Sequence, residues 1–272
     1  MQKKIIVAIC CFLSGYLFTL GYINKEALLE YGSNFSSKIF KSEETLKKNR
    51  FLLMISSWKR PMLLSGQILR FMNQTYDNYK ISVSIKGTPE DWIRSTFMKE
   101  WQPFIDKGDL LVRFDENKDQ LSNLLDTIRN IPLEEYDYFC KIDDDDWYAP
   151  HYLEEVNRYL NKEKNIDISS TLNMVVLENG DKQVKMRYNN WDWSGQTICI
   201  SRPMAKALLE IEENPAAYEP LYPASEVLRL RSNKEDALIH HFIRAIGGKP
   251  QERDTPKTDI IYGRQYPSVT RY

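Results

Sequence analysis

The sequence has little cysteine and no excess of charge of either sign. Four cysteines stand among 272 residues, and 37 basic residues face 38 acidic ones. Cys10 and Cys11 lie in an apolar N-terminal run, whereas Cys140 and Cys199 lie in runs that predict buried strands, where a thiol usually packs as a small hydrophobic group. The sequence therefore predicts no disulfide framework. The balanced charge argues against a general electrostatic grip on nucleic acid, so no nucleic-acid partner is expected.

Internal repeats and low-complexity tracts are also absent from the sequence. With 42% apolar and 12% aromatic residues, the chain can bury a sizeable core and is not a disordered polymer. We therefore expect one domain, large enough for an enzyme, that binds a specific ligand.

An uncharged apolar run near the N-terminus, residues 5–23, follows a basic tail at 1–4. Its length is roughly that of a helix that crosses a hydrocarbon core, so we expect a single-pass membrane anchor. A cleaved signal peptide is the alternative, although no small-x-small cleavage site follows. Lysines flank the run on both sides, which leaves the membrane side of the remaining chain undetermined. The polar residues 24–49 predict a stem or linker.

Strand and helix patterns alternate beyond residue 50. Strands are expected at 51–58, 79–87, 109–114 and 136–142, and helices at 61–76, 92–105, 121–131 and from Pro150 onward. Such alternation predicts an α/β domain with a mainly parallel sheet flanked by helices.

Four adjacent aspartates, Asp143–Asp146, follow the fourth predicted strand. Ligands of open α/β sheets bind at the carboxyl ends of strands, so these side chains are expected in the ligand crevice. Four neighbouring carboxylates repel one another unless a cation neutralises them, which predicts Mn²⁺ or Mg²⁺. A solvated acidic loop is the alternative. An EF-hand calcium loop is excluded because Tyr148 stands where the glycine is required.

Two segments resemble family 2-like glycosyltransferases of the GT-A fold. RFLLMISSWKRPMLLSGQILRFMNQTYDNYKISVSIKG resembles the opening of that family, and KIDDDDWYAPHYLEEV resembles its Asp-x-Asp segment. The resemblance covers about residues 50–250 and implies a Rossmann-like fold. It divides the domain into a nucleotide-sugar-binding half, 50–146, and an acceptor-binding half, 147–250. The remaining residues, 251–272, are expected to form a C-terminal tail or a lid.

The resemblance implies that Asp143 and Asp145 hold a metal ion that bridges the diphosphate of a nucleotide-sugar donor, with UDP as the expected nucleotide. The residues expected on the donor side are Ser56, Ser57, Trp58, Arg60, Lys86, Asp143 and Asp144. Trp58 has packing in the core as its alternative role. The family commonly places an acidic base-contacting residue after the second strand, and this chain has none there, although Arg113 and Asp115 offer a substitute.

The second half of the domain is expected to bind the acceptor and to supply the general base. Trp191 and Trp193 offer flat faces for a sugar, with Gly195 beside them, although large aromatic residues are more often core. Glu235 and Asp236 resemble the family's Glu-Asp pair, in which the aspartate takes the acceptor proton.

Helix capping is the alternative role for Glu235, since Ser232 stands three residues before it. His240 lies one helical turn beyond Asp236 and is expected as a third metal ligand or an orienting partner, with simple packing as the alternative.

The sequence thus predicts a membrane-anchored, metal-dependent, inverting glycosyltransferase that acts on a glycan or glycolipid acceptor. A non-catalytic glycan- or nucleotide-sugar-binding protein and a nucleotidyltransferase are the alternatives. The latter is disfavoured because ISSWKRP lacks the glycine of a phosphate loop.

Overall fold

The computed structural model describes residues 46–88, 90, 96–115, 119–162, 165–171, 173–178, 182–187, 195–223, 225, 235–253 and 260–264. The chain divides into two units at Lys47 and Lys48, and every element below belongs to the second unit. The predicted anchor at 5–23 and most of the predicted stem lie outside the described residues. Within the described ranges, no helix combines the length and apolar character needed to cross a membrane.

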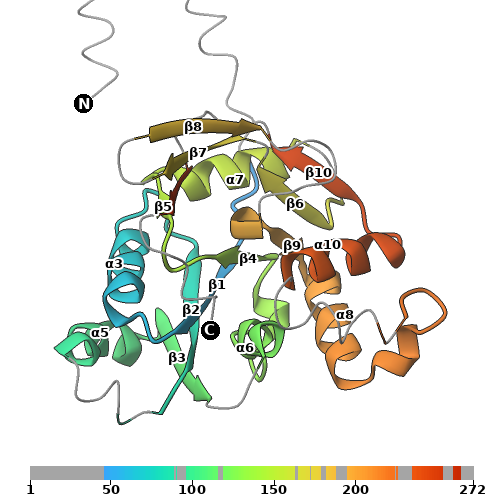
Figure 1. Ribbon diagram of the computed structural model, residues 1–272, viewed down its shortest axis with the longest axis horizontal. Helices are drawn as coiled ribbons and strands as arrows, with labels where there is room; N and C mark the ends of the chain where they lie inside the picture. The colour runs from blue at the N-terminus through green and yellow to red at the C-terminus, as the bar shows by residue number, and fades with distance from the viewer. Residues whose placement is uncertain are drawn as a thin grey trace, which may run out of the picture. The chain divides into compact units, whose positions relative to one another are not determined.

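A seven-stranded sheet organises the domain, with strand order β10-β6-β9-β4-β1-β2-β3 (Figure 1). Its strands are β1 (Phe51–Trp58), β2 (Tyr79–Lys86), β3 (Leu110–Asp115), β4 (Tyr138–Ile142), β6 (Ile168–Thr171), β9 (Cys199–Ser201) and β10 (Pro250–Arg253). Strand β1 pairs in parallel with β2 and β4, and β2 pairs in parallel with β3. Strand β9 lies antiparallel to both β4 and β6. The predicted mainly parallel α/β sheet is confirmed.

Helices cover both faces of this sheet because its central strand is apolar on both sides. Phe51, Leu53 and Ile55 pack in one core with α3 (Pro61–Met72), α5 (Thr96–Lys107) and α7 (Tyr152–Leu160). Leu52 and Met54 face the opposite core, with α6 (Gln120–Asp126), α8 (Arg202–Glu213) and α10 (Glu235–Ala245). Successive strand residues point to opposite faces, so one buried strand joins two helical layers.

Local signals fix where these elements begin. Pro61 opens α3, a position where its missing N–H costs no hydrogen bond. Asp119 caps α6, where its side chain accepts a hydrogen bond from the Ser122 backbone N–H at 2.9 Å. Helix α6 ends at Asp126, so the helix predicted at 121–131 is five residues too long at its C-terminal end. The short 3-10 helices η1 (Leu133–Glu135), η2 (Gly195–Thr197) and η3 (Pro215–Tyr218) complete the helical elements described.

A second, four-stranded sheet has the order β5-β11-β7-β8 and was not predicted. It consists of β5 (Trp147–Tyr148), β7 (Asn173–Glu178), β8 (Lys182–Arg187) and β11 (Ile260–Arg264). Because β10 belongs to the main sheet and β11 to this second sheet, the sheets extend past the predicted domain boundary at residue 250. These two short strands were not predicted, since sheet pairing over four or five residues leaves little sequence signal, and a tail or lid from 251 stays a prediction.

A disulfide joins the two central-sheet cysteines. Cys140 and Cys199 stand directly opposite each other in the antiparallel pair of β4 and β9 and form a disulfide bond. Both residues are fully buried. The expectation of two separate buried thiols was therefore wrong, because strand register, which spacing in the sequence cannot reveal, brings the thiols together.

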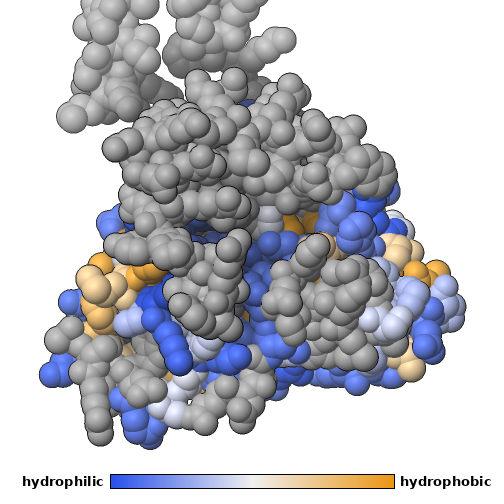
Figure 2. All heavy atoms as spheres, in the orientation of Figure 1, coloured by the Kyte–Doolittle hydropathy of each residue, from blue (hydrophilic) through white to orange (hydrophobic). Residues whose placement is uncertain are grey.

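The described surface is largely hydrophilic in the view of Figure 2, with separate apolar areas toward the two sides. This agrees with the mean hydropathy of −0.50. Met62 is the most exposed large apolar side chain described, at 74%.

Candidate active site

The acidic run lies at the carboxyl edge of the central parallel strands, as predicted. Ile55 of β1 is paired with Ile142 of β4, so Ser57 and the aspartates leave neighbouring strands at the same edge. The Ser57 hydroxyl donates a hydrogen bond of 2.5 Å to Asp144 Oδ2. The predicted juxtaposition of the first loop with the aspartates is thus present in the fold.

Arg60 is the main basic partner of this part of the run. Its guanidinium lies 2.8 Å from Asp144 Oδ1 and 2.7 Å from Asp145 Oδ2. The preceding residue, Lys59, has a left-handed φ of 55°, which turns the chain from β1 into α3. Burial raises the pKa of Asp144 to about 7, although Arg60 and the Ser57 hydrogen bond act in the opposite direction. Burial likewise raises the pKa of Asp145.

The backbone of the acidic loop is held by side chains from α3 and β5. Gln67 donates a hydrogen bond to the Asp143 carbonyl at 2.9 Å, and Arg70 donates to the Asp146 carbonyl at 3.0 Å. The Asp143 N–H donates to the Tyr148 hydroxyl oxygen at 3.1 Å. Such contacts fix the loop backbone and so limit the directions in which the carboxylates can point.

Lys141 connects the acidic loop to α10, and sequence reasoning missed it. Its Nζ lies 2.7 Å from Asp143 Oδ1, 2.8 Å from Asp236 Oδ1 and 3.5 Å from Glu235 Oε1. The structure thereby brings the predicted metal-binding segment and the predicted Glu-Asp pair to one point. A lysine two residues before an aspartate gives no sequence signal of this kind, because the α10 partners come from far along the chain.

Glu235 is buried, and its carboxylate already has hydrogen-bond and ion-pair partners. Gln120 donates a hydrogen bond of 2.7 Å to its Oε1, and only 5% of its side chain is exposed. Burial raises the pKa of Glu235 to about 7, while the Lys141 ammonium lowers it. Glu235 thus lies behind the site, in the first turn of α10. Its proposed capping partner, Ser232, lies outside the described residues.

Asp236 is the more accessible member of the pair, with 36% of its side chain exposed. It packs directly on Gly195, where a Cβ would lie 1.8 Å from Asp236 Oδ2. Only glycine leaves room for this approach. Gly195, expected on the acceptor side, therefore lies beside the expected base. The expected acceptor residues Trp191 and Trp193 lie outside the described residues.

The carboxylates at this edge exceed the basic groups that pair with them. Arg60 and Lys141 are shared among five carboxylates, those of Asp143, Asp144, Asp145, Glu235 and Asp236. The two basic groups offset part of the repulsion between the carboxylates, from which a metal ion was predicted. An excess of acidic oxygens remains, and Asp143 and Asp145 keep 28% and 38% of their side chains exposed. Two accessible carboxylates suit a hard divalent cation that draws its other ligands from phosphate and water.

His240 does not complete a protein ligand set. In the part of the chain that the structure describes, no three His, Cys, Asp or Glu side chains gather as a group that could hold a metal ion. The expected set of Asp143, Asp145 and His240 is therefore not assembled, because Asp143 and Asp145 turn toward Lys141 and Arg60. The His240 side chain is buried in α10, and burial lowers its pKa to about 4.

Trp58 and Lys86 meet at the ends of β1 and β2. They are paired in the parallel register, and Lys86 Nζ lies 5.2 Å from the centre of the Trp58 ring. Trp58 is 37% exposed, so its ring is only partly packed against the core.

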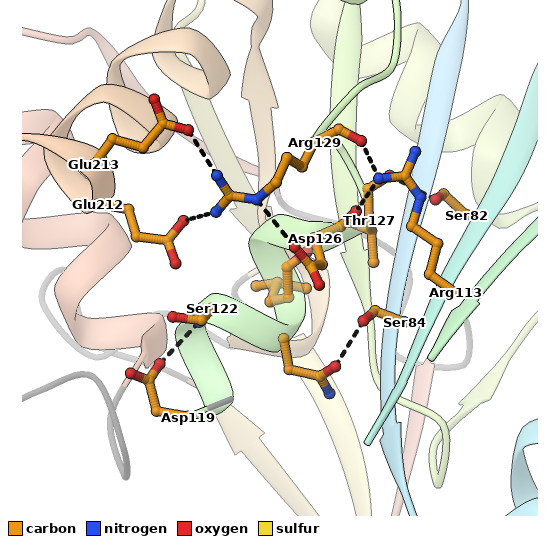
Figure 3. A network of polar contacts seen from close by, with 12 residues as sticks. Ser82, Ser84, Arg113, Asp119, Ser122, Asp126, Thr127, Arg129, Glu212 and Glu213 are labelled. Atoms are coloured by element: carbon orange, nitrogen blue, oxygen red, sulfur yellow. Dashed lines mark hydrogen bonds and ion pairs between the residues drawn. The ribbon is translucent and has the colours of Figure 1, made fainter. Parts of the chain in front are cut away.

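Arg113 does not replace the missing base-contacting acid, because its guanidinium donates to the backbone carbonyls of Asp126 and Arg129 (Figure 3).

The mixed, mainly parallel α/β fold is similar to that of two solved structures and is consistent with a GT-A-like fold. The crystal structure of S. aureus TarS 1–349 matches with a TM-score of 0.53 and 10% sequence identity, over 79% of this chain and 60% of that chain. A second S. aureus TarS structure matches with a TM-score of 0.50 and 11% identity, over 79% of this chain and 36% of that chain.

At these identities the likeness shows the fold alone. This chain spans about 60% of the length of the first neighbour and about 36% of the second. No protein-family model matches the chain, and no curated protein matches it in sequence. The predicted α/β fold with a mainly parallel sheet is confirmed and is consistent with a GT-A-like fold, whereas the narrower family 2 assignment stays a prediction.

Proposed function

We propose that this protein is a metal-dependent, inverting glycosyltransferase that moves a sugar from a nucleotide-diphosphate donor, with UDP as the expected nucleotide, to a glycan or glycolipid acceptor. The observation that carries the proposal is the meeting of Asp143 and Asp236 at the Lys141 ammonium, at the carboxyl edge of the sheet. A donor-binding acid and an acceptor-activating base must face one reaction centre, and the closeness of these two carboxylates supports assigning them those roles.

Asp236 is the proposed general base because its exposure and partners differ from those of Glu235. A group that takes a proton from an acceptor hydroxyl has to reach that hydroxyl within hydrogen-bond distance. Asp236 has 36% of its side chain exposed, against 5% for Glu235. Glu235 instead accepts a hydrogen bond from Gln120 and lies near the Lys141 ammonium. Its proposed role is to orient the start of α10.

Asp143 and Asp145 are the proposed ligands of Mn²⁺ or Mg²⁺. The bound ion would stabilise the negative charge that develops on the leaving nucleoside diphosphate. Arg60, which now contacts Asp144 and Asp145, stands beside this place and can donate to phosphate oxygens. Trp58, with Lys86 against its ring, is the proposed contact for the nucleoside end. Membrane attachment through residues 5–23 stays part of the prediction from sequence.

Replacing Asp236 by Asn tests the proposed function. The amide keeps the size of the side chain but cannot take a proton, so sugar transfer should fall by about 10²-fold or more. Binding of UDP with Mn²⁺, followed by calorimetry, should stay within about threefold of the wild type, because Asp236 is not a proposed metal ligand. The activity assay uses a panel of nucleotide sugars, with donor hydrolysis measured in the absence of acceptor.

Two results would contradict the proposal. Undiminished transfer by the Asp236→Asn variant would remove the base assignment. A wild-type protein that binds a nucleotide sugar yet neither transfers nor hydrolyses it with any donor of the panel would point instead to a binding protein of the same fold.

A further inference from the structure

Lys141 is a buried cation at the centre of the candidate active site. Only 5% of its side chain is exposed, and its ammonium contacts carboxylates that come from the acidic loop and from the first turn of α10. An ammonium group has three N–H donors and no acceptor, which matches the three carboxylates of Asp143, Glu235 and Asp236.

The central strand fixes where this ammonium lies. Lys141 belongs to β4, where its backbone N–H donates to the Ile198 carbonyl at 2.7 Å and its Cα is paired with Met54 of β1. The side chain therefore extends from a strand that is paired along both of its edges. Three carboxylates surround the Lys141 ammonium, and their negative charge offsets the cost of burying a cation. A buried ammonium persists only when it is paired in this way.

The contact with Lys141 also decides which oxygen of Asp236 is offered to a substrate. Oδ1, which lies 2.8 Å from the ammonium, is itself buried, although the whole side chain is 36% exposed. The remaining oxygen, Oδ2, lies against Gly195, in the space that a Cβ on residue 195 would fill. The Lys141 ammonium thus contacts Oδ1 and not Oδ2, so the two oxygens of the Asp236 carboxylate have different surroundings.

We propose that Lys141 is a positioning residue: its ammonium orients Asp236 so that Oδ2 faces the acceptor hydroxyl, and it ties this base to Asp143 of the donor-binding loop. The inference rests on the proposed function and adds a residue that acts through Asp236. Lys141 itself takes no proton and touches no reacting atom.

A double-mutant cycle between Lys141→Gln and Asp236→Asn tests the inference. Glutamine keeps a donor for the carboxylates but removes the charge. Transfer by Lys141→Gln should lose about 10- to 100-fold in kcat, the range expected when a catalytic group is misplaced. The affinity for UDP with Mn²⁺ should stay within about threefold. Adding Lys141→Gln to Asp236→Asn should cost little further activity, because the residue through which Lys141 acts is already disabled. Lys206→Gln, at an exposed position of α8, is the matched control and should change nothing.

Each outcome of the cycle decides the inference. Wild-type kcat in Lys141→Gln, or losses that multiply in the double variant, would overturn it. If Lys141→Gln alone fails to fold while the double variant folds, the pairing with Asp236 is supported, since the double variant has one carboxylate fewer left without the ammonium. Failure of both to fold would overturn it and leave Lys141 with a structural role only.

Failure of the proposed function gives a different result. A wild-type protein without any transfer activity would end the proposal of sugar transfer, and the melting temperatures of the same four proteins would still report on the pairing. Additive changes in melting temperature would contradict the contact between Lys141 and Asp236, whereas a clear departure from additivity would support it.

Discussion

At the scale of single residues, the candidate site depends on a glycine as much as on its carboxylates. The Asp236 carboxylate occupies the space that a Cβ on residue 195 would fill. A side chain there must push the aspartate aside, because the 1.8 Å separation is far inside van der Waals contact. Gly195 is therefore proposed to set the position of the base through Oδ2, as Lys141 does through Oδ1.

Gly195→Ala should lower sugar transfer by about tenfold or more through this displacement, with donor binding maintained. Gly66→Ala is the matched control. Gly66 lies in α3 with nothing within 4 Å of its added Cβ, so alanine there should keep activity and add about 0.5–1 kcal/mol of stability. Steady-state kinetics and thermal melting follow both variants. Full activity in Gly195→Ala would show that the position of Asp236 seen here is not the one that matters for turnover.

At the scale of secondary-structure elements, ion pairs and a disulfide join segments that are distant in the sequence. Arg129, just after α6, reaches Glu212 and Glu213 at the end of α8 and also pairs with Asp126 (Figure 3). Glu212 is nearly buried, with 7% of its side chain exposed. These contacts hold α6 against α8 on the face of the sheet from which Gln120 reaches the site.

Arg129→Ala should cost about 2–4 kcal/mol in the free energy of unfolding, because it leaves buried carboxylates without their partner. Arg158→Ala is the comparison, since its bond to Glu155 lies on the surface of α7 and such pairs contribute about 0.5 kcal/mol. Urea denaturation of both variants measures the difference. Equal losses would mean that the α6–α8 contact is held by its apolar residues alone.

The disulfide between β4 and β9 lies one residue before Lys141 in the strand that leads into the acidic loop. It closes a loop with a sequence separation of 59 residues, which corresponds to about 4 kcal/mol in the chain-entropy description. Reduction with dithiothreitol should therefore lower the melting temperature clearly. A Cys140→Ala/Cys199→Ala variant should melt lower than the oxidised wild type and show no response to the reductant. A melting temperature that reductant leaves unchanged in the wild type would speak against the bond.

At the scale of the whole molecule, the fold of the parallel core and the place of the acidic loop could be predicted from the sequence. Alternating apolar segments predicted the parallel core of β1 to β4, because buried strands and amphipathic helices have distinct periods. The place of Asp143–Asp146 followed from that order. Lys141, the disulfide and the second sheet could not be predicted, since each depends on strand register or on pairing between distant segments. The anchor, Trp191 and Trp193 lie outside the described residues, and their roles stay predictions.

The central claim is that the acidic edge of the sheet holds a divalent ion together with a nucleoside diphosphate. Its most direct test is calorimetry of UDP binding, with and without Mn²⁺, to the wild-type protein and to Asp145→Ala. Asp145 is the most exposed of the proposed ligands and forms its observed ion pair with Arg60, so its removal should leave the fold intact. We predict that Mn²⁺ strengthens UDP binding by the wild type at least about tenfold and that Asp145→Ala abolishes this gain. Equal UDP binding with and without Mn²⁺ in the wild type, or an undiminished gain in Asp145→Ala, would contradict the account.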